Sequence, residues 1–593
     1  MDSGRPDCHA SSQVTIRQHV FLDDEEQQKA GLLVEANRAW FGVTKAERSC
    51  AGRPAPGGFF ETSHGALWLV LGVAWGSTRK ALPTSRTMRR AMPLSSLPII
   101  PPIPSLIPFS TPFSTTAPVA PAPAADLARL QRLRAGEFGG LRRLDLSCGL
   151  TEFPREIFAL ADSLEILNLS GNLLRRPPDD LHRLHKLRVL FCSDNCFTEL
   201  PPVLGRCTAL TMIGFKANQI DSVPAAALPP SLRWLILTDN RIASLPEALG
   251  GCSALQKLML SGNRLHHLPA SLVALDKLEL LRIAANRFTA LPDWLFTLPR
   301  LAWLACAGNP MSDAHEATAQ AAYPMPLINW SELQLDQQVG EGASGVIYLG
   351  RWQPVQSRPA GTPAIPVAIK LFKGAMTSDG LPHSEMAACS AAGTQPNLIG
   401  FKGRISGHPA GVDGLVMEPI SAAFVNLAGP PSLDSCTRDV YAPDQRFSAA
   451  AALRLATDIA AAVAHLHARG ILHGDLYAHN ILWNPQALEA PAPVPALLGD
   501  FGAASFFATH ADGAATTGAA ANAPGLALQC IETRAFGCLL EELLERCAGV
   551  SVPPAERAAV DALTLLKQRC LHPEVLNRPV FANILEELKR MCV

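Results

Sequence analysis

The stretch from His473 to Asn480, His-Gly-Asp-Leu-Tyr-Ala-His-Asn, holds an aspartate and an asparagine five residues apart. The carboxylate of Asp475 can accept the proton of an attacking hydroxyl, and the amide oxygen of Asn480 can help to hold a metal ion. A second carboxylate follows in Asp500-Phe501-Gly502, 25 residues after Asp475. An aspartate and an asparagine at this spacing also occur as turn and cap residues. The pair therefore indicates phosphoryl transfer only if a phosphate-binding element accompanies it.

A glycine-rich segment upstream supplies such an element. Gly340-Glu341-Gly342-Ala343-Ser344-Gly345 matches G-x-G-x-x-G. In a dinucleotide-binding turn the glycines lead into a helix, whereas here they lie between two strand-like runs, Leu333–Val339 and Val346–Leu349. Because glycines carry no side chains, a hairpin of this kind lets backbone N–H groups approach phosphates. The next predicted strand ends at Lys370, whose charge suits the α- and β-phosphates of ATP, and Glu385 follows 15 residues later.

With these motifs in this order, residues from about 330 to 593 resemble a eukaryotic-type protein kinase domain, which has a bilobal α+β fold. The start at Asn329–Leu333 and the ending at Asn577–Phe581 resemble the tyrosine-kinase-like branch of that family. Ser448–Arg469 is predicted to be the long helix before the catalytic loop, with a serine N-cap and Gly470 as its stop.

The resemblance implies a role for each motif residue. Asp475 would be the catalytic base, with Lys370 and Asn480 as further catalytic residues, and Asn480 and Asp500 would bind Mg²⁺. Leu415–Glu418 resembles the hinge strand that meets adenine, with its methionine at the gatekeeper position. The expected ATP-binding residues are Gly340, Glu341, Gly342, Gly345, Val346, Ala368, Lys370, Glu385, Met417 and Glu418.

The catalytic loop departs from the family pattern at three positions. Gly474 stands where many kinases carry an arginine that receives an activation-loop phosphate, so the domain resembles the non-RD kinases. Tyr477 stands where serine/threonine kinases commonly have lysine, and His479 stands where tyrosine kinases often have arginine. The loop therefore does not identify the acceptor hydroxyl. His-Gly-Asp-Leu also occurs in the aminoglycoside and choline kinase families, which leaves a small-molecule acceptor open.

The segment after Asp500-Phe501-Gly502 also departs from the family. It is short and rich in Ala, Gly and Thr, and it holds no clear Ala-Pro-Glu, so we predict that phosphorylation of Thr509, Thr516 or Thr517 is not needed for basal activity. Glu532 takes the place of an aspartate that anchors the following helix in relatives. Arg578, which relatives pair with the missing glutamate, must find another partner.

Composition narrows the function classes. The chain has 593 residues, 48% hydrophobic residues and a formal net charge of −1, which gives no basic excess for binding nucleic acid or an anionic membrane. Its 15 cysteines are scattered and form no Cys-x-x-Cys pair, so a zinc site is disfavoured. Buried free thiols are typical of a reducing compartment, and we expect a cytoplasmic protein.

Residues 1–125 show no regular periodicity. Pro93–Ala125 is rich in Pro, Ser and Thr and is predicted to be disordered. Gly65–Trp75 is apolar but only 11 residues long, too short to span a bilayer as a helix. We therefore expect no membrane span and disfavour a receptor kinase.

Residues 126–310 carry an internal repeat. Asparagines recur every 22 or 23 residues, each after a leucine-type strand: Asn172, Asn195, Asn218, Asn240, Asn263, Asn286 and Asn309. With a first repeat at Leu141–Pro154, this is the leucine-rich-repeat pattern, about eight repeats of an α/β horseshoe with short parallel strands. Ala124–Arg134 is predicted to cap the first repeat, and residues 311–329 to link the array to the kinase domain.

The positions between the leucines of each strand are predicted to face outward on the concave side. They are Arg188, Phe191, Lys216, Arg233, Trp234, Lys257, Arg282 and Trp303. Exposed tryptophans would favour a protein-binding face, because large aromatic residues are common interface anchors.

The sequence thus predicts a multidomain chain: a disordered region 1–125, a leucine-rich-repeat solenoid 126–310, a linker 311–329 and a protein kinase domain 330–593. We expect an ATP- and Mg²⁺-dependent kinase, acting on serine or threonine, whose repeats bind a protein partner or substrate. A catalytically impaired pseudokinase scaffold and a small-molecule phosphotransferase remain as alternatives.

Overall fold

The computed structural model describes residues 124–593, except 343, 355–362, 378, 487–494, 509–522, 548–553 and 592–593. The region 1–125 predicted to be disordered, with its short apolar stretch, lies outside the described residues except for Ala124 and Ala125, which begin a helix. Thr509, Thr516 and Thr517 also lie outside the described residues.

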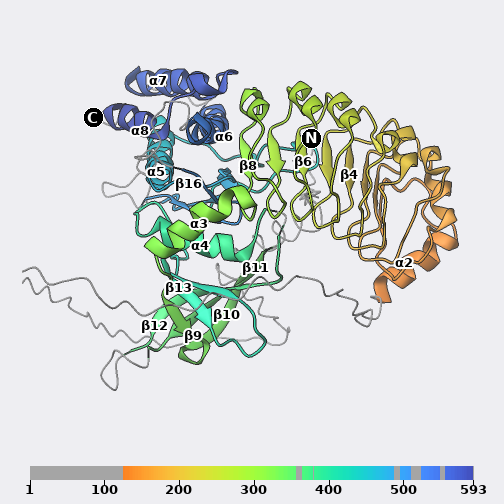
Figure 1. The fold of residues 1–593 in the computed structure, drawn as a ribbon, viewed down its shortest axis with the longest axis horizontal. Helices are drawn as coiled ribbons and strands as arrows, with labels where there is room; N and C mark the ends of the chain where they lie inside the picture. The colour runs from red at the N-terminus through yellow and green to blue at the C-terminus, as the bar shows by residue number, and fades with distance from the viewer. Residues whose placement is uncertain are drawn as a thin grey trace, which may run out of the picture. The chain divides into compact units, whose positions relative to one another are not determined.

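The N-terminal half of the described chain is a stack of parallel strands that begins after helix α2 (Ala124–Arg134). The strands lie side by side in sequence order (Figure 1). Their bounds are β1 Arg143–Asp145, β2 Ile166–Asn168, β3 Val189–Phe191, β4 Met212–Gly214, β5 Trp234–Ile236, β6 Lys257–Met259, β7 Leu280–Arg282 and β8 Trp303–Ala305. Short 3-10 helices separate them: η1 Arg155–Leu160, η2 Leu181–Arg183, η3 Pro202–Arg206, η4 Ala225–Ala227, η5 Glu247–Gly251, η6 Ala270–Ala274 and η7 Asp293–Thr297.

Alternation along each strand builds the core of this stack. The central residue of each strand points inward and is at most 1% exposed: Leu144, Leu167, Leu190, Ile213, Leu235, Leu258, Leu281 and Leu304. The recurring asparagines connect neighbouring turns. Asn263, for example, accepts the Ile242 N–H at 3.0 Å and donates to the carbonyls of Leu237 and Leu260 at 2.9 Å each. The repeats therefore form the solenoid that their period predicts.

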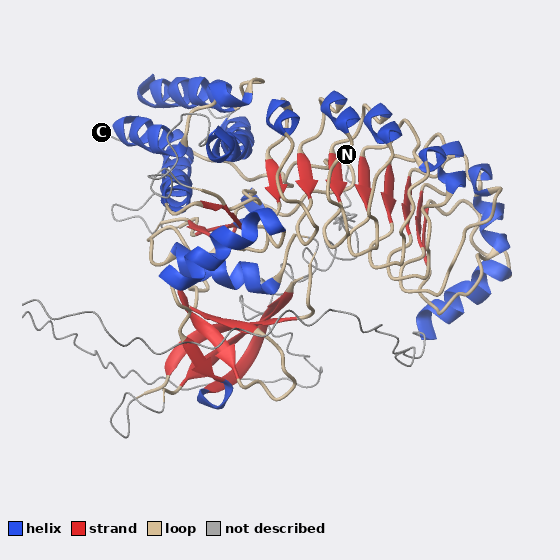
Figure 2. Cartoon of the chain, viewed as in Figure 1, coloured by secondary structure: helices blue, strands red, loops and turns tan. Residues whose placement is uncertain are grey.

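The C-terminal half has two lobes. The smaller lobe is a six-stranded sheet in the order β10-β11-β12-β14-β13-β9, with α3 and α4 beside it (Figure 2). The elements are α3 Pro310–Ala322, β9 Leu327–Asn329, η8 Trp330–Glu332, β10 Leu333–Glu341, β11 Gly345–Trp352, β12 Ile365–Phe372, α4 Pro382–Ala392, β13 Phe401–Ser406 and β14 Gly414–Met417.

The larger lobe is mostly helical and is organised around α5 (Ala449–Ala468). Its other elements are β15 Val425–Asn426, β16 Ile471–Leu472, η9 Ala478–Asn480, β17 Ile481–Trp483, β18 Leu497–Leu498, β19 Ser505–Phe506, α6 Ala523–Cys547, α7 Pro554–Cys570, η11 Val575–Asn577 and α8 Phe581–Met591. The Ser448 hydroxyl caps α5 by accepting the Ala451 N–H at 3.1 Å, and Gly470 ends it at a φ of +68°. Within the described part of the chain, α5 is the one helix long and apolar enough to cross a membrane, but most of it is buried as this lobe's core.

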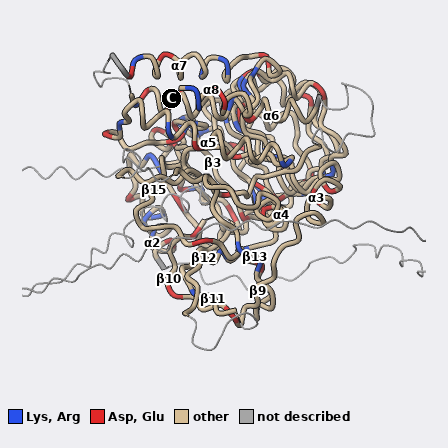
Figure 3. Tube along the Cα trace, turned by 90° about the vertical axis from the view of Figure 1, so that its left-hand side faces the viewer, with Lys and Arg blue, Asp and Glu red and all other residues tan. Residues whose placement is uncertain are grey.

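The repeats and the two-lobed domain share their cores. One buried cluster joins Met259 and Trp303 of the array to the apolar face of α5. A second cluster joins the leucine core of the array to Leu472, Phe507 and Ile531 of the larger lobe. The expected fold class, a solenoid followed by a bilobal α+β domain, is confirmed. Lys and Arg are interspersed with Asp and Glu along the trace (Figure 3).

The expectation that Trp234 and Trp303 are exposed on the concave side is wrong. Their exposed fractions are 0% and 1%. The ammonium of Lys257 lies 4.1 Å from the centre of the Trp234 ring, and the Trp303 indole stacks on Tyr477 of the larger lobe at 4.2 Å. Phe191, Lys257 and Arg282, expected on the same face, are buried as well. At β8, the larger lobe covers the concave side of the array.

Candidate active site

A cavity of about 340 Å³ lies between the two lobes, under the hairpin that joins β10 to β11. Gly340, Gly342 and Gly345 line it on one side and Met417 and Glu418, at the end of β14, line it on another. The close approach of this hairpin to β12 requires glycine at one place, because a Cβ on Gly345 would lie 2.5 Å from the carbonyl oxygen of Leu371. The cavity thus combines a backbone-lined mouth with an apolar hinge strand.

A buried ion pair lies at the back of this cavity. The Lys370 ammonium of β12 donates to a carboxylate oxygen of Glu385 on α4 at 2.5 Å, and both side chains line the cavity. Burial acts to lower the pKa of Lys370, but Glu385 and Asp500 outweigh it and raise that pKa, so the ammonium stays charged. A fixed cation facing the cavity can hold an anionic ligand such as a phosphate.

Asn480 and Asp500 place oxygen ligands at the other wall of the cavity. Asp500 has a φ of +57°, a left-handed conformation that aspartate tolerates, and one of its carboxylate oxygens accepts the Gly502 N–H at 3.2 Å. The Asn480 side chain donates its amide N–H to the Asp475 carboxylate at 2.8 Å. That bond turns the amide nitrogen toward Asp475 and leaves the amide oxygen as a metal ligand. Amide and carboxylate oxygens suit Mg²⁺, whose other ligands would come from phosphate and water.

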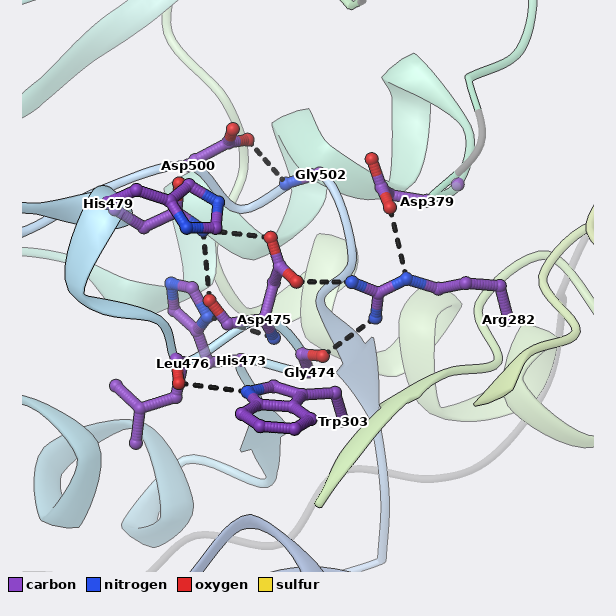
Figure 4. A network of polar contacts seen from close by, with 12 residues as sticks. Arg282, Trp303, Asp379, His473, Gly474, Asp475, Leu476, His479, Asp500 and Gly502 are labelled. Atoms are coloured by element: carbon purple, nitrogen blue, oxygen red, sulfur yellow. Dashed lines mark hydrogen bonds and ion pairs between the residues drawn. The ribbon is translucent and has the colours of Figure 1, made fainter. Parts of the chain in front are cut away.

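Asp475 does not line the cavity, but it is hydrogen-bonded to Asn480, which does. It is buried, with 7% of its surface exposed. One carboxylate oxygen accepts from Asn480, and the other accepts from Arg282 of the repeat array. Arg282 also donates to the Gly474 carbonyl at 2.8 Å and forms an ion pair with Asp379 at 3.0 Å (Figure 4).

Glu532 of α6 accepts hydrogen bonds from the backbone of the catalytic loop. Its carboxylate accepts the N–H of Gly474 at 2.6 Å, the N–H of His473 at 3.3 Å and the Nε2 of His467 at 2.7 Å. Burial acts to raise the pKa of Glu532, but these hydrogen bonds and the neighbouring histidines lower it overall, so the carboxylate is charged. Glu532, expected to stand in for the residue that anchors this helix, thus ties α6 to the backbone of the catalytic loop.

Arg578 forms hydrogen bonds with the array and with its own lobe. Its guanidinium donates to the carbonyls of Pro299 at 2.8 Å and Leu301 at 3.4 Å, and to those of His572 and Cys530 in its own lobe. In relatives, by the resemblance above, the matching arginine pairs with a glutamate of the activation segment. Here two carbonyls of the array, those of Pro299 and Leu301, accept hydrogen bonds from the arginine instead.

The structure brings together most of the residues expected at the ATP site. Among the described residues, the cavity lining includes Gly340, Glu341, Gly342, Gly345, Ala368, Lys370, Glu385, Met417 and Glu418. Val346 is not in the lining, because successive residues of β11 point to opposite faces; its neighbours Gly345 and Ile347 face the cavity instead. Counting the alternation of β11 from Gly345 would have predicted from the sequence that Ile347, and not Val346, faces the cavity.

Sequence reasoning missed the residues that come from outside the domain. Arg282 and Trp303 of the array contact Asp475 and Leu476, and Glu279 contacts Arg438. No local pattern links partners about 160 to 190 residues apart. In the part of the chain that the structure describes, no group of three or more His, Cys, Asp or Glu residues is placed to hold a metal ion by itself.

Comparison with family models matches residues 333–538 to the protein tyrosine and serine/threonine kinase family. Leucine-rich-repeat models match residues 163–184 and 230–288. A solved leucine-rich-repeat protein of Leptospira interrogans is 25% identical, covering 30% of this chain and 52% of that one at a TM-score of 0.26.

Among curated proteins, the probable serine/threonine-protein kinase gdt2 of Dictyostelium discoideum is 26% identical over 179 residues, 30% of this chain. A protein phosphatase PHLPP-like protein of Drosophila melanogaster is 39% identical over 13% of the chain, and Toll-like receptor 9 of Equus caballus is 38% identical over 16%. The matches span only 8–10% of the length of these relatives. The chain therefore carries leucine-rich repeats followed, at its C-terminal end, by a domain of the protein tyrosine and serine/threonine kinase family.

Proposed function

We propose that this protein is an ATP- and Mg²⁺-dependent serine/threonine protein kinase of the cytoplasm whose repeats bind a protein partner. One observation carries the proposal: Lys370, paired with Glu385, faces Asn480 and Asp500 across a single cavity roofed by the glycine hairpin. A phosphoryl-transfer site needs a cation for the phosphates, oxygen ligands for a metal and a carboxylate next to them. The chain supplies each group from a different element.

Each side chain has a defined task in this proposal. Lys370 holds the α- and β-phosphates, and Glu385 fixes the lysine in place. Asp475 orients the acceptor hydroxyl and accepts its proton, and Asn480 is held against Asp475 by its amide N–H. Mg²⁺, when bound between Asn480 and Asp500, would neutralise charge on the phosphates. Because catalysis here is mostly positioning and charge stabilisation, small displacements of Asp475 matter.

The choice of serine or threonine as acceptor rests on the relative from Dictyostelium discoideum, which is described as a probable serine/threonine-protein kinase. The choice of cytoplasm rests on the cysteines: the described cysteines are free thiols, most of them buried. Free thiols of this kind are usual in reducing compartments. The concave side of the early repeats, where Arg188 is exposed, is the surface we assign to a protein partner.

A pseudokinase scaffold is the second candidate, and a specific observation favours it. Asp475 is covered by Arg282 and is only 7% exposed, so a protein hydroxyl cannot reach it in this arrangement. A domain fixed permanently in this arrangement would bind nucleotide without transferring phosphate.

The test compares nucleotide binding with phosphate transfer. Full-length protein, Lys370→Met and Asp475→Ala would be incubated with γ-labelled ATP and Mg²⁺, with casein as a generic acceptor, and binding would be measured separately by calorimetry. We expect wild type to bind Mg·ATP and to label casein on serine or threonine. Lys370→Met should lose most binding, whereas Asp475→Ala should keep binding and lose labelling. Equal labelling by wild type and Asp475→Ala would contradict the proposal.

A further inference from the structure

Asp475 contacts a residue that lies outside the kinase domain, Arg282 of the repeat array. Arg282 is the last residue of β7, next to the buried Leu281, and its side chain points toward Asp475 (Figure 4). The guanidinium contacts one carboxylate oxygen of Asp475, the carbonyl oxygen of Gly474 and the carboxylate of Asp379. It is 2% exposed, and burial alone would lower its pKa, but the two carboxylates raise the pKa of Arg282, so it remains a cation.

Further contacts fasten the array to the same loop and to the segment that precedes α5. The Trp303 indole N–H donates to the Leu476 carbonyl at 3.0 Å, and its ring stacks on Tyr477. Glu279 accepts two hydrogen bonds from the Arg438 guanidinium, each at 3.2 Å, and a further one from the Thr437 hydroxyl. All three array residues come from β7 and β8 or the residue just before β7. They form one face, which we call the clamp: Glu279, Arg282 and Trp303.

The clamp covers the acceptor side of the active site and leaves the nucleotide side free. Lys370, Asn480 and Asp500 line a cavity of about 340 Å³, while Asp475 lies outside its lining. The Lys370–Glu385 pair is formed, so the smaller lobe is already arranged for nucleotide. An acceptor hydroxyl needs a carboxylate oxygen of Asp475, but Arg282 and Asn480 each engage one.

We propose that the repeat array inhibits the kinase in cis: Arg282, held on Asp475, lets ATP enter the cavity but slows the access of a protein acceptor to the catalytic aspartate. This inference rests on the proposed kinase function. It also accounts for the departures of the catalytic loop. Gly474 leaves room for the Leu304 carbonyl of the array, which a Cβ at that position would meet at 2.7 Å, and Tyr477 provides the ring on which Trp303 stacks.

The inhibition is tested by removing the arginine. Full-length wild type, Arg282→Ala and Arg264→Ala would be compared in the initial rate of labelling of casein by γ-labelled ATP. Arg264 is the matched control, because it is an exposed arginine of the array outside the concave positions. We expect Arg282→Ala to raise the rate at least about fivefold, the lower end of usual coupling between sites. Arg264→Ala should match wild type, and the affinity for Mg·ATP should be the same in all three proteins.

A second variant approaches the clamp from the kinase side. Arg438→Ala removes the bonds to Glu279 without altering the array or any residue at the cavity, and should also raise the rate, by less than Arg282→Ala. Adding Asp475→Asn to Arg282→Ala should abolish the labelling.

The possible failures are distinct. If wild type labels casein as fast as Arg282→Ala and Arg438→Ala, the protein is a kinase but the inhibition is wrong. A rate that falls in both folded variants would make the clamp an aid to catalysis and would also overturn the inhibition. If no variant labels casein while all bind Mg·ATP, the proposed kinase function itself fails.

Discussion

Gly474 is a residue whose lack of a side chain allows the array to pack against the catalytic loop. It has a φ of +76°, and a Cβ there would lie 2.5 Å from the Ala503 carbonyl oxygen and 2.7 Å from that of Leu304. An arginine at this position, as in many kinases, would have to move both the strand that follows Asp500 and the last repeat. The glycine therefore reflects packing against the array as well as the absence of a phosphate receptor.

Gly474→Ala should destabilise the protein strongly. The left-handed backbone costs about 1–2 kcal/mol for a residue with a Cβ, and the clash with two carbonyls adds about 1–3 kcal/mol. Gly411→Ala is the matched control, because Gly411 has a φ of +66° with nothing within 4 Å of its Cβ position. Denaturant unfolding should show a loss of about 1–2 kcal/mol for Gly411→Ala and roughly twice that for Gly474→Ala. Equal losses would show that Leu304 does not press on the loop.

Glu542 is a second residue whose environment sets its chemistry. It lies on α6 and accepts the Tyr441 hydroxyl at 3.0 Å. Burial and the nearby Asp439 raise the pKa of Glu542 from 4.5 to about 8. Between those pH values the folded protein binds a proton that the unfolded chain has lost, so stability falls as the pH rises.

Glu542→Gln should remove this pH dependence. Gln keeps an oxygen that can accept the Tyr441 hydroxyl but never ionises. We expect the variant to match wild type near pH 5 and to have a higher melting temperature at pH 8.5. The experiment is thermal unfolding of both proteins across pH 5–9. Parallel curves for the two proteins over this range would mean that Glu542 is not protonated in the folded protein.

At the scale of elements, the recurring asparagines of the repeats, which we call the asparagine ladder, both mark the period in the sequence and bond neighbouring repeats in the structure. The side chain of Asn263 joins two successive repeats, through the Ile242 N–H and the Leu237 carbonyl of the preceding repeat and the carbonyls of Leu260 and Ser261 in its own. The asparagine is 7% exposed, so water cannot replace these bonds.

Asn263→Ala should cost about 1–3 kcal/mol, because it leaves buried backbone groups without partners. The neighbouring Arg264 is exposed, and Arg264→Ala should change stability by less than about 0.5 kcal/mol. Urea unfolding of both variants, compared with wild type, measures the difference. An Asn263→Ala protein as stable as Arg264→Ala would show that the ladder is not an important source of stability.

The sequence predicted the elements whose pattern is local. The 22- or 23-residue period, the helix that begins after Ser448 and the hairpin of β10 and β11 were all expected from spacing and caps, and the structure contains them. Lys370 and Glu385 could also be paired in advance, because a family resemblance connects them.

Contacts between distant elements could not be predicted in this way. Arg282 reads as an outward-facing residue of a repeat, and its partner Asp475 lies 193 residues later. The burial of Trp303 has the same cause, since its strand pattern is the same whether solvent or another domain covers it. Such contacts depend on how two domains pack, which no single strand or helix encodes.

At the scale of the whole molecule, the repeat array and the kinase domain share one hydrophobic core. Leu472, Phe507, Leu528 and Ile531 of the kinase domain are buried in the same cluster as the array leucines. Removing the array would expose them to water, at a cost of about 25 cal/mol for each Å² of apolar surface.

We therefore predict that the full chain unfolds in a single calorimetric transition. A fragment of residues 324–593 should melt several degrees lower than the full chain or self-associate through its exposed apolar surface. The control is a fragment that keeps the array, residues 120–593, which should melt as the full chain does. Two separate transitions in the full chain, one at the melting temperature of the isolated kinase fragment, would contradict a shared core.

The most direct test of the account is one labelling assay on three full-length proteins: wild type, Arg282→Ala and Arg282→Ala/Asp475→Asn, each with γ-labelled ATP, Mg²⁺ and casein. Inhibition by Arg282 of a kinase that uses Asp475 predicts slow transfer by wild type, transfer at least about fivefold faster by Arg282→Ala, and none by the double variant. Labelling by the double variant at the rate of Arg282→Ala would contradict it, because the phosphate would then be transferred without Asp475.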